Sequence, residues 1–197
     1  MEKTPDEKEH LGQSDHSHDI TDERAQRKRI LEALLFVSDK PLPADTISKA
    51  AEMKHPEIKE LFEDLRSEYS ARNSAIMVVE IAGGYQMVTD PDLAPWVRRL
   101  KNINQASKLS QASLETLAIV AYKQPITKIE IDQLRGVNSE GALRGLLDKR
   151  LIKILGKKDV PGRPFLYGTS REFLQYFGLN SLVELPPIAD LMKDEAA

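Results

Sequence analysis

Apolar residues recur at helical spacing in three successive segments of the N-terminal half. The segments are RAQRKRILEALLFVSD (24–39), PADTISKAAEM (43–53) and PEIKELFEDLRSEYSA (56–71). In the first segment, the apolar positions that follow this spacing are Ile30, Leu31, Leu34, Leu35 and Val37. In the third, Ile58, Leu61, Phe62 and Leu65 share one face and acidic residues cover the other. The pattern predicts three amphipathic helices with prolines at their boundaries.

The next stretch, AIMVVEIAGGYQMVT (75–89), is rich in β-branched and aromatic residues. Two such runs flank Gly83-Gly84, and glycines between them are typical of a β-hairpin turn. A short helix is expected in DPDLAPWVRRL (90–100). Three helices followed by a hairpin is the element order of a winged-helix domain.

A similar order of elements begins again in the second half. LETLAIVAYKQPI (114–126) resembles LEALLFVSDKPL (31–42), with five identical residues at an offset of 83 positions. We assign Leu31, Leu34, Leu114 and Leu117 to the cores of the two repeats. Thr127 and Glu130 have the spacing of a capping box at the start of a second helix.

The rest of the second repeat contains a third helix, a hairpin and a closing helix. Asn138 or Ser139 is expected to cap the third helix, EGALRGLLDKR, which turns its leucines inward. LIKIL (151–155) and FLYGT (165–169) are expected to be strands on either side of a loop that contains Lys157, Lys158 and Arg163. Ser170 can start the closing helix and Gly178 can end it.

These patterns predict a mainly α fold with small β-hairpins (α+β), built as two tandem winged-helix domains. The expected divisions are a disordered acidic tail (1–23), an N-terminal winged-helix domain (24–101), a linker (102–112), a C-terminal winged-helix domain (113–178) and a C-terminal extension (179–197). The tail is too polar to offset the entropy of ordering it.

Composition excludes several classes of function. The chain has no cysteine, which rules out disulfides and thiolate catalysis. It has no P-loop, and His55 is the only histidine outside the tail. We therefore expect no catalytic residues, no bound metal and no cofactor; the tail histidines His10, His16 and His18 lack a framework for metal binding. No apolar run is long enough to span a bilayer and no signal sequence is apparent, so we expect a cytoplasmic protein without membrane contact.

Charge distribution bears on whether the protein binds DNA. Residues 1–23 carry eight acidic and two basic side chains, whereas 113–171 carry eleven basic and six acidic ones. In the second domain Lys157, Lys158 and Arg163 lie in the expected wing, and further basic residues lie in or beside its third helix: Arg135, Arg144, Lys149 and Arg150. This set could contact phosphates but lacks a cluster of base-reading side chains. We expect at most weak, non-specific DNA contact; the alternative is a winged-helix DNA-binding transcriptional regulator.

Two stretches resemble a known family. SLETLAIVAYKQPITKIEIDQLRGVNS (113–139) and GRPFLYGTSREFLQYFGLNSLVELPP (162–187) are similar to segregation and condensation protein B, and the resemblance extends over residues 24–187. It implies a non-enzymatic homodimer in chromosome condensation and segregation, associated with the nucleoid. It further implies binding to a kleisin subunit, segregation and condensation protein A, which links it to the ATPase of a structural maintenance of chromosomes (SMC) complex.

The residues that contact the kleisin have to be chosen from exposed edges and apolar positions. Our candidates are the wing residues and the apolar run after the last helix: Arg163, Phe165, Tyr167, Leu179, Leu182, Val183 and Leu185. The apolar run could equally fold back on its own domain, and the sequence leaves the two possibilities open.

Overall fold

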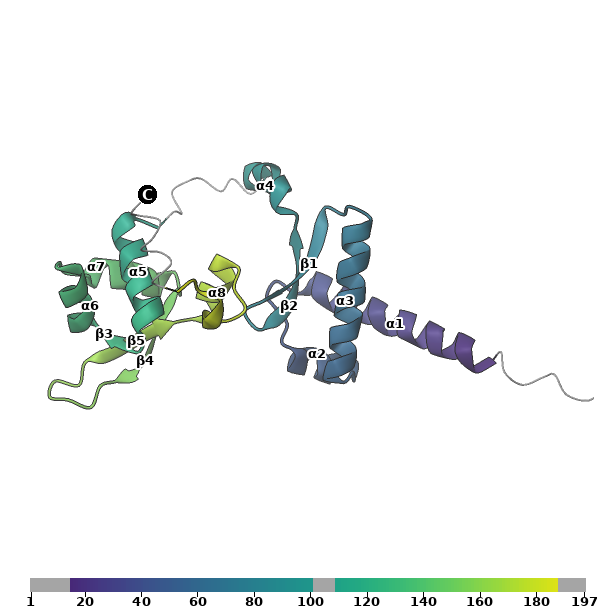
Figure 1. Ribbon diagram of the computed structural model, residues 1–197, viewed down its shortest axis with the longest axis horizontal. Helices are drawn as coiled ribbons and strands as arrows, with labels where there is room; N and C mark the ends of the chain where they lie inside the picture. The colour runs from purple at the N-terminus through teal and green to yellow at the C-terminus, as the bar shows by residue number, and fades with distance from the viewer. Residues whose placement is uncertain (1–14, 101–108, 188–197) are drawn as a thin grey trace, which may run out of the picture.

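The computed structural model describes residues 15–100 and 109–187, with side chains from residue 22 onward (Figure 1). Two units lie side by side, and in each of them helices pack on a small antiparallel sheet. The predicted fold class, mainly α with small antiparallel hairpins, is confirmed. The winged-helix assignment and the exact domain limits stay predictions. Within the described residues, no helix is long and apolar enough to cross a membrane.

The first unit has the predicted order of elements. These are α1 (Asp15–Val37), α2 (Ala44–Ala51), α3 (His55–Ala71), β1 (Ile76–Ile81) and β2 (Gly84–Thr89), followed by η1 (Pro91–Leu93) and α4 (Ala94–Leu100). Ile58, Leu61, Phe62 and Leu65 of α3 are buried as expected. They pack with Leu31 and Leu35 of α1 in one hydrophobic core.

Helix α1 differs from expectation at both ends. It begins at Asp15, inside the stretch expected to be a disordered tail, while residues 1–14 lie outside the described part. At its other end Val37, which was counted among the apolar residues at helical spacing, is 78% exposed. Successive residues of a helix are about 100° apart, so Val37 lies about 200° from buried Leu35 and on the opposite side. Ile30 is also partly exposed, at 37%.

The hairpin turn falls one residue earlier than predicted. Ile81 pairs with Gly84, which leaves Ala82 and Gly83 as the two turn residues. Both have positive φ, 51° and 66°, as a type I′ turn requires. Gly84 belongs instead to β2, where a Cβ would lie 2.9 Å from both the carbonyl carbon and the carbonyl oxygen of Leu42. Glycine is needed there for close approach and not for the turn.

The second unit repeats the order with one extra strand. Its elements are α5 (Gln111–Lys123), β3 (Ile126–Thr127), α6 (Lys128–Arg135), α7 (Glu140–Asp148), β4 (Ile152–Lys157), β5 (Phe165–Thr169), α8 (Arg171–Phe177) and η3 (Leu182–Glu184). The strands lie in the order β3–β5–β4. Helix α5 begins within the expected linker because Ser110 caps it and accepts a hydrogen bond from the Ser113 amide. Residues 101–108 lie outside the described part.

The predicted caps of the second unit are present in most cases. Thr127 and Glu130 form the capping box at the start of α6. Ser170 caps α8, and Gly178 ends it with φ of 70°. Ser139 stands at the start of α7 but its side chain makes no capping hydrogen bond, since its hydroxyl donates to Asp132.

The second core is close to the predicted one. Leu117 is buried in it, together with Leu143 and Leu146 of α7. Leu114 was predicted to be a core residue and this is wrong, because its side chain is 40% exposed. It precedes Leu117 by three residues on α5, at the edge of the buried face.

The two units meet through hydrogen bonds at the tip of the first hairpin. The Ala82 amide donates to the carbonyl of Leu179 at 2.9 Å. Arg171, the first residue of α8, donates from Nε to the Ala82 carbonyl at 3.1 Å and from Nη2 to the Pro41 carbonyl at 3.4 Å. In Figure 1 the hairpin tip correspondingly reaches the segment around α8.

Candidate partner-binding surface

The wing of the second unit is a well-defined loop between β4 and β5. The Lys158 amide donates to the Pro164 carbonyl at 2.9 Å, and the Arg163 amide donates to the Val160 carbonyl at 2.9 Å. Arg163 and Phe165 are exposed on it, and the Phe165 ring centroid lies 5.3 Å from the Lys157 ammonium. Tyr167 points back and packs against the core. The wing thus presents an arginine and an aromatic ring to solvent.

One of the wing lysines is held by an ion pair. Lys158 Nζ lies 2.6 Å from Glu130 Oε1 of α6. The other oxygen of the same carboxylate accepts from the amide and the hydroxyl of Thr127, each at 2.8 Å. The Lys158 hydrogen bond and the Thr127 bonds lower the pKa of Glu130 to about 2. This latch fixes the wing to the start of α6 and offsets the charge of Lys158.

A second carboxylate joins α6 to α7. Asp132 accepts from Lys128 Nζ at 2.6 Å and from the Ser139 amide at 2.8 Å, and also from the Ser139 hydroxyl. The lysine bond and the serine bonds lower the pKa of Asp132 to about 2. The loop before α7 is therefore held by a charged hydrogen-bond acceptor.

The basic residues expected near a DNA backbone are only partly available. Arg135 is 8% exposed and pairs with Glu115 at 3.1 Å, so its guanidinium faces the protein. Lys158 is engaged by Glu130. Exposed bases remain at Arg144, Lys149, Arg150, Lys157 and Arg163. They lie on the wing, on α7 and in the turn after α7.

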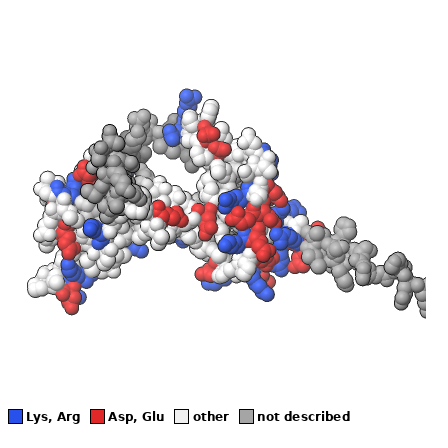
Figure 2. All heavy atoms as spheres, in the orientation of Figure 1, with Lys and Arg blue, Asp and Glu red and all other residues white. Residues whose placement is uncertain are grey.

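Several acidic side chains of α3 form ion pairs with basic side chains of α1. Arg24 lies 2.7 Å from Asp64 and 3.5 Å from Glu60, Arg27 lies 3.1 Å from Glu57, and Lys28 pairs with Glu68. Figure 2 accordingly shows acidic and basic side chains interleaved over the first unit. These ion pairs place the α3 acids beside the bases of α1 at the surface of the first unit.

The apolar run after α8 divides into two groups. Leu179 and Leu185 pack partly against the second core, and the Pro186 carbonyl accepts from the Tyr122 hydroxyl at 2.7 Å. Between them, η3 turns outward: Leu182 is 38% and Val183 91% exposed. The seven predicted contact residues therefore separate into three that support the unit and four that are accessible, namely Arg163, Phe165, Leu182 and Val183.

Other surface features were not found from the sequence. Exposed apolar side chains occur at Phe36 and Val37 on α1, Trp96 and Leu100 on α4, and Ile129, Leu134 and Val137 in and after α6. A groove also runs beside β1. Phe36 is next to the buried Leu35 on a helix, and an apolar residue off the buried stripe indicates a second contact. Among the described side chains, no group of three or more metal-binding residues occurs.

Comparison with known proteins points to one family. The family model described as segregation and condensation complex subunit ScpB matches residues 29–188. A protein of Syntrophotalea carbinolica named segregation and condensation protein B is 50% identical over 163 residues, which cover 83% of this chain and 82% of that one. Its namesake in Clostridium tetani is 45% identical over 165 residues, covering 84% and 87%. A solved dimer of the ScpB N-terminal domain complexed with ScpA peptide is 30% identical, covers 39% of this chain and 95% of that chain, and has a TM-score of 0.36.

Proposed function

Because this protein belongs to the ScpB family of segregation and condensation complex subunits, we propose that it acts as a homodimer that binds the kleisin subunit, ScpA. Through the kleisin it joins an SMC ATPase at the nucleoid, in the cytoplasm, and does no chemistry of its own. The match over residues 29–188 carries this proposal. It covers both units, so the proposed role belongs to the whole fold.

Self-association is assigned to the first unit. Ile30, Phe36 and Val37 are exposed on the side of α1 that its own core does not use, at 37%, 81% and 78%. A second copy would cover this apolar surface. Leu31 and Leu35 of α1 are buried against α3 in the core of the first unit, so this surface is positioned before two copies meet. A stable interface would bury about 1,600 Å² in total.

Kleisin binding is assigned to the exposed members of the predicted contact set. Phe165 and Val183 offer apolar surface, and Arg163 offers a charged, multiply donating head group. Tyr167, Leu179 and Leu185 contribute indirectly, because they pack beneath the wing and η3. The contact is expected to be dominated by apolar groups and to survive moderate salt.

A titration of the full-length protein with the middle segment of the kleisin tests the proposal. We expect saturable binding to the dimer, weakened about tenfold or more by Val183→Asp because a carboxylate would enter an apolar contact. Val137→Asp, a matched change at another exposed valine, should leave binding unchanged. No binding by the unaltered protein, together with tight sequence-selective DNA binding, would overturn the proposed function.

Sedimentation tests the assignment of the dimer contact separately. Phe36→Asp should shift the protein toward monomer, since a carboxylate would be buried between two copies. Tyr176→Asp, at an aromatic residue that is 56% exposed on α8, should not. A dimer that persists unchanged with Phe36→Asp would place the contact elsewhere.

A further inference from the structure

Strand β1 has one edge that no other strand covers within the described residues. Its sheet contains only β1 and β2. The outer edge of β2 is closed by Leu42, whose amide and carbonyl bond to the carbonyl and amide of Tyr85 at 2.8 and 2.9 Å. In the described part of the chain the outer edge of β1 has no such partner, and an uncovered edge is a template for another strand.

The register identifies which main-chain groups point outward from this edge. Tyr85 lies opposite Glu80 and uses its own amide and carbonyl to bond Leu42, away from β1. In an antiparallel pair, opposite residues direct these groups either toward each other or both away. Glu80 therefore directs its amide and carbonyl away from β2, and so does Val78, two residues earlier. Four main-chain hydrogen-bonding groups line the outer edge.

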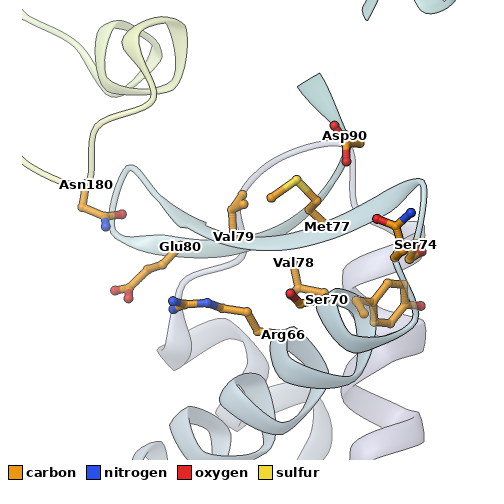
Figure 3. A pocket seen from close by; sticks show the side chains of 11 residues that line it. Arg66, Ser70, Ser74, Met77, Val78, Val79, Glu80, Asp90 and Asn180 are labelled. Carbon is orange, nitrogen blue, oxygen red and sulfur yellow. The ribbon is translucent and has the colours of Figure 1, made fainter. Parts of the chain in front are cut away.

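A groove follows the same edge. It has a volume of about 450 Å³ and lies between β1 and α3 (Figure 3). Met77 and Val79 line it from one face of the strand, and Val78 and Glu80 from the other. A groove lined by both faces of a strand must run along its edge. Arg66 and Ser70 of α3 form the opposite wall.

One end of the groove contains an acceptor without a donor. Asn180, in the segment that follows α8, lines the groove beside Glu80 in Figure 3. Its Oδ1 atom is buried and has no hydrogen-bond partner among the described residues. Buried acceptors are normally satisfied, and one left open at a groove is suited to an arriving N–H. The adjacent residue Leu179 is fixed by its bond to Ala82.

We propose that the outer edge of β1 pairs with an extended segment of the kleisin, which adds a third strand to the first unit and fills this groove. The inference rests on the proposed function and names a contact site for it. Strand addition supplies main-chain hydrogen bonds for affinity and side-chain pockets for selectivity. The stretch from Val78 to Glu80 matches about three residues of an extended peptide, roughly 10 Å.

Continuity with the exposed part of η3 favours the kleisin over a second copy of this protein. Asn180 ends the groove, and Leu182 and Val183 follow two and three residues later in the sequence. One extended segment could therefore run from the β1 edge to the apolar side chains already assigned to the kleisin. The exposed apolar residues of α1 are assigned separately to self-association.

A proline at position 80 tests the pairing directly. In Glu80→Pro the outward amide is lost and the ring occupies the edge, whereas the bonds from β1 to β2 are kept. Glu80→Ala removes the carboxylate and keeps the amide, so it is the matched control. In titrations of the full-length dimer with the kleisin middle segment, we expect about tenfold or greater weakening by the proline and little change with alanine. Thermal unfolding of both variants checks that the first unit remains folded.

Amide hydrogen exchange provides a second readout that needs no variant. The Val78 and Glu80 amides should exchange quickly in the free dimer and become protected when the kleisin segment is added. Kleisin binding without that protection, or equal binding by the proline and alanine variants, would overturn the edge assignment while leaving the proposed function intact. Absence of kleisin binding by the unaltered protein would instead overturn the proposed function. Loss of the dimer in Glu80→Pro alone would assign the edge to self-association and also overturn the inference.

Discussion

At the scale of single residues, two glycines differ in what surrounds them. A Cβ on Gly84 would meet the backbone of Leu42 at 2.9 Å and Arg171 Nη2 at 3.1 Å. A Cβ on Gly168 would meet the side-chain ends of Leu155 and Gln124 at 2.6 and 2.8 Å. The Leu155 side chain can move aside, and Gln124 can move once its Oε1 gives up the hydrogen bond from the Thr169 amide. The Leu42 backbone, held by its two bonds to Tyr85, can move only if the chain itself shifts. Gly84 is therefore the less replaceable of the two.

Gly84→Ala should lower the free energy of unfolding by about 1–3 kcal/mol, because the added methyl overpacks a fixed contact. Gly145→Ala is the control: it lies inside α7 with open space around its Cα, and should raise stability by about 0.5–1 kcal/mol. Urea unfolding followed by circular dichroism measures both. An unchanged midpoint for Gly84→Ala would show that the Leu42 segment yields easily.

At the scale of elements, the sequence predicted the features that are set by residues close together along the chain, such as helix caps and helix ends. The Thr127 capping box and the Gly178 helix end were found because each is encoded within a few residues. Strand β3 was missed because two residues, Ile126 and Thr127, carry no periodicity. The hairpin turn was placed one residue late because Gly83-Gly84 offers two glycines and only the packing of Leu42 distinguishes their roles.

Contacts between distant elements were beyond such reasoning. Lys158 and Glu130 are 28 positions apart, and nothing in either local pattern indicates that they pair. The same holds for the uncovered edge of β1. Leu42 covers the outer edge of β2, and the local sequence does not indicate that Leu42 pairs with β2 and not with β1. Of the predicted contact set, sequence could identify apolar and basic residues but not which of them the fold would bury.

Two carboxylates of α6, Glu130 and Asp132, predict that the second unit is sensitive to acid. Glu130 and Asp132 have pKa values of about 2, below their usual 4.5 and 3.8. The unfolded state therefore binds more protons than the folded one in acid, and stability should fall as the pH drops from about 4.5 toward 2. Above about pH 5 these two groups should add no further pH dependence.

Chemical unfolding at about pH 7, 4 and 3 measures this decline. Glu130→Gln should be less stable than the unaltered protein at neutral pH and should lose less stability on acidification. Glu172→Gln, an exposed glutamate on α8, is the control and should retain the full decline. Identical acid profiles for Glu130→Gln and the unaltered protein would contradict the role of the Lys158 latch.

At the scale of the whole molecule, relative placement of the units depends on few hydrogen bonds. Arg171 supplies two of them, and the Ala82 amide supplies another. Arg171→Ala should loosen the junction without disturbing either core, because the Arg171 side chain lies outside both. Small-angle X-ray scattering should show a broader distribution of distances, with little change in thermal unfolding. Arg144→Ala, at an exposed arginine on α7, should leave the scattering profile unchanged.

The surface charge also predicts weak contact with DNA. If the wing and helix bases bound duplex DNA tightly, about six phosphates would be neutralised, and log affinity would fall with log salt concentration with a slope of about −5. With Lys158 and Arg135 in ion pairs and a net charge of −3, we expect weak binding and a shallower slope. Fluorescence anisotropy over a range of salt concentrations measures it. Tight binding together with a slope of about −5 would favour a DNA-binding role.

The hydrogen bonds at the junction between the two units require few particular side chains. Every acceptor and donor that the first hairpin and the Pro41 segment offer to the second unit is a peptide group. Any residue at positions 41 and 82 keeps the accepting carbonyl, and any residue except proline at position 82 keeps the donating amide. Arg171 is therefore the side chain that these hydrogen bonds require. A chimera that joins the first half of this protein to the second half of a relative should keep the same docking, provided that the incoming half brings an arginine at the start of its α8 equivalent.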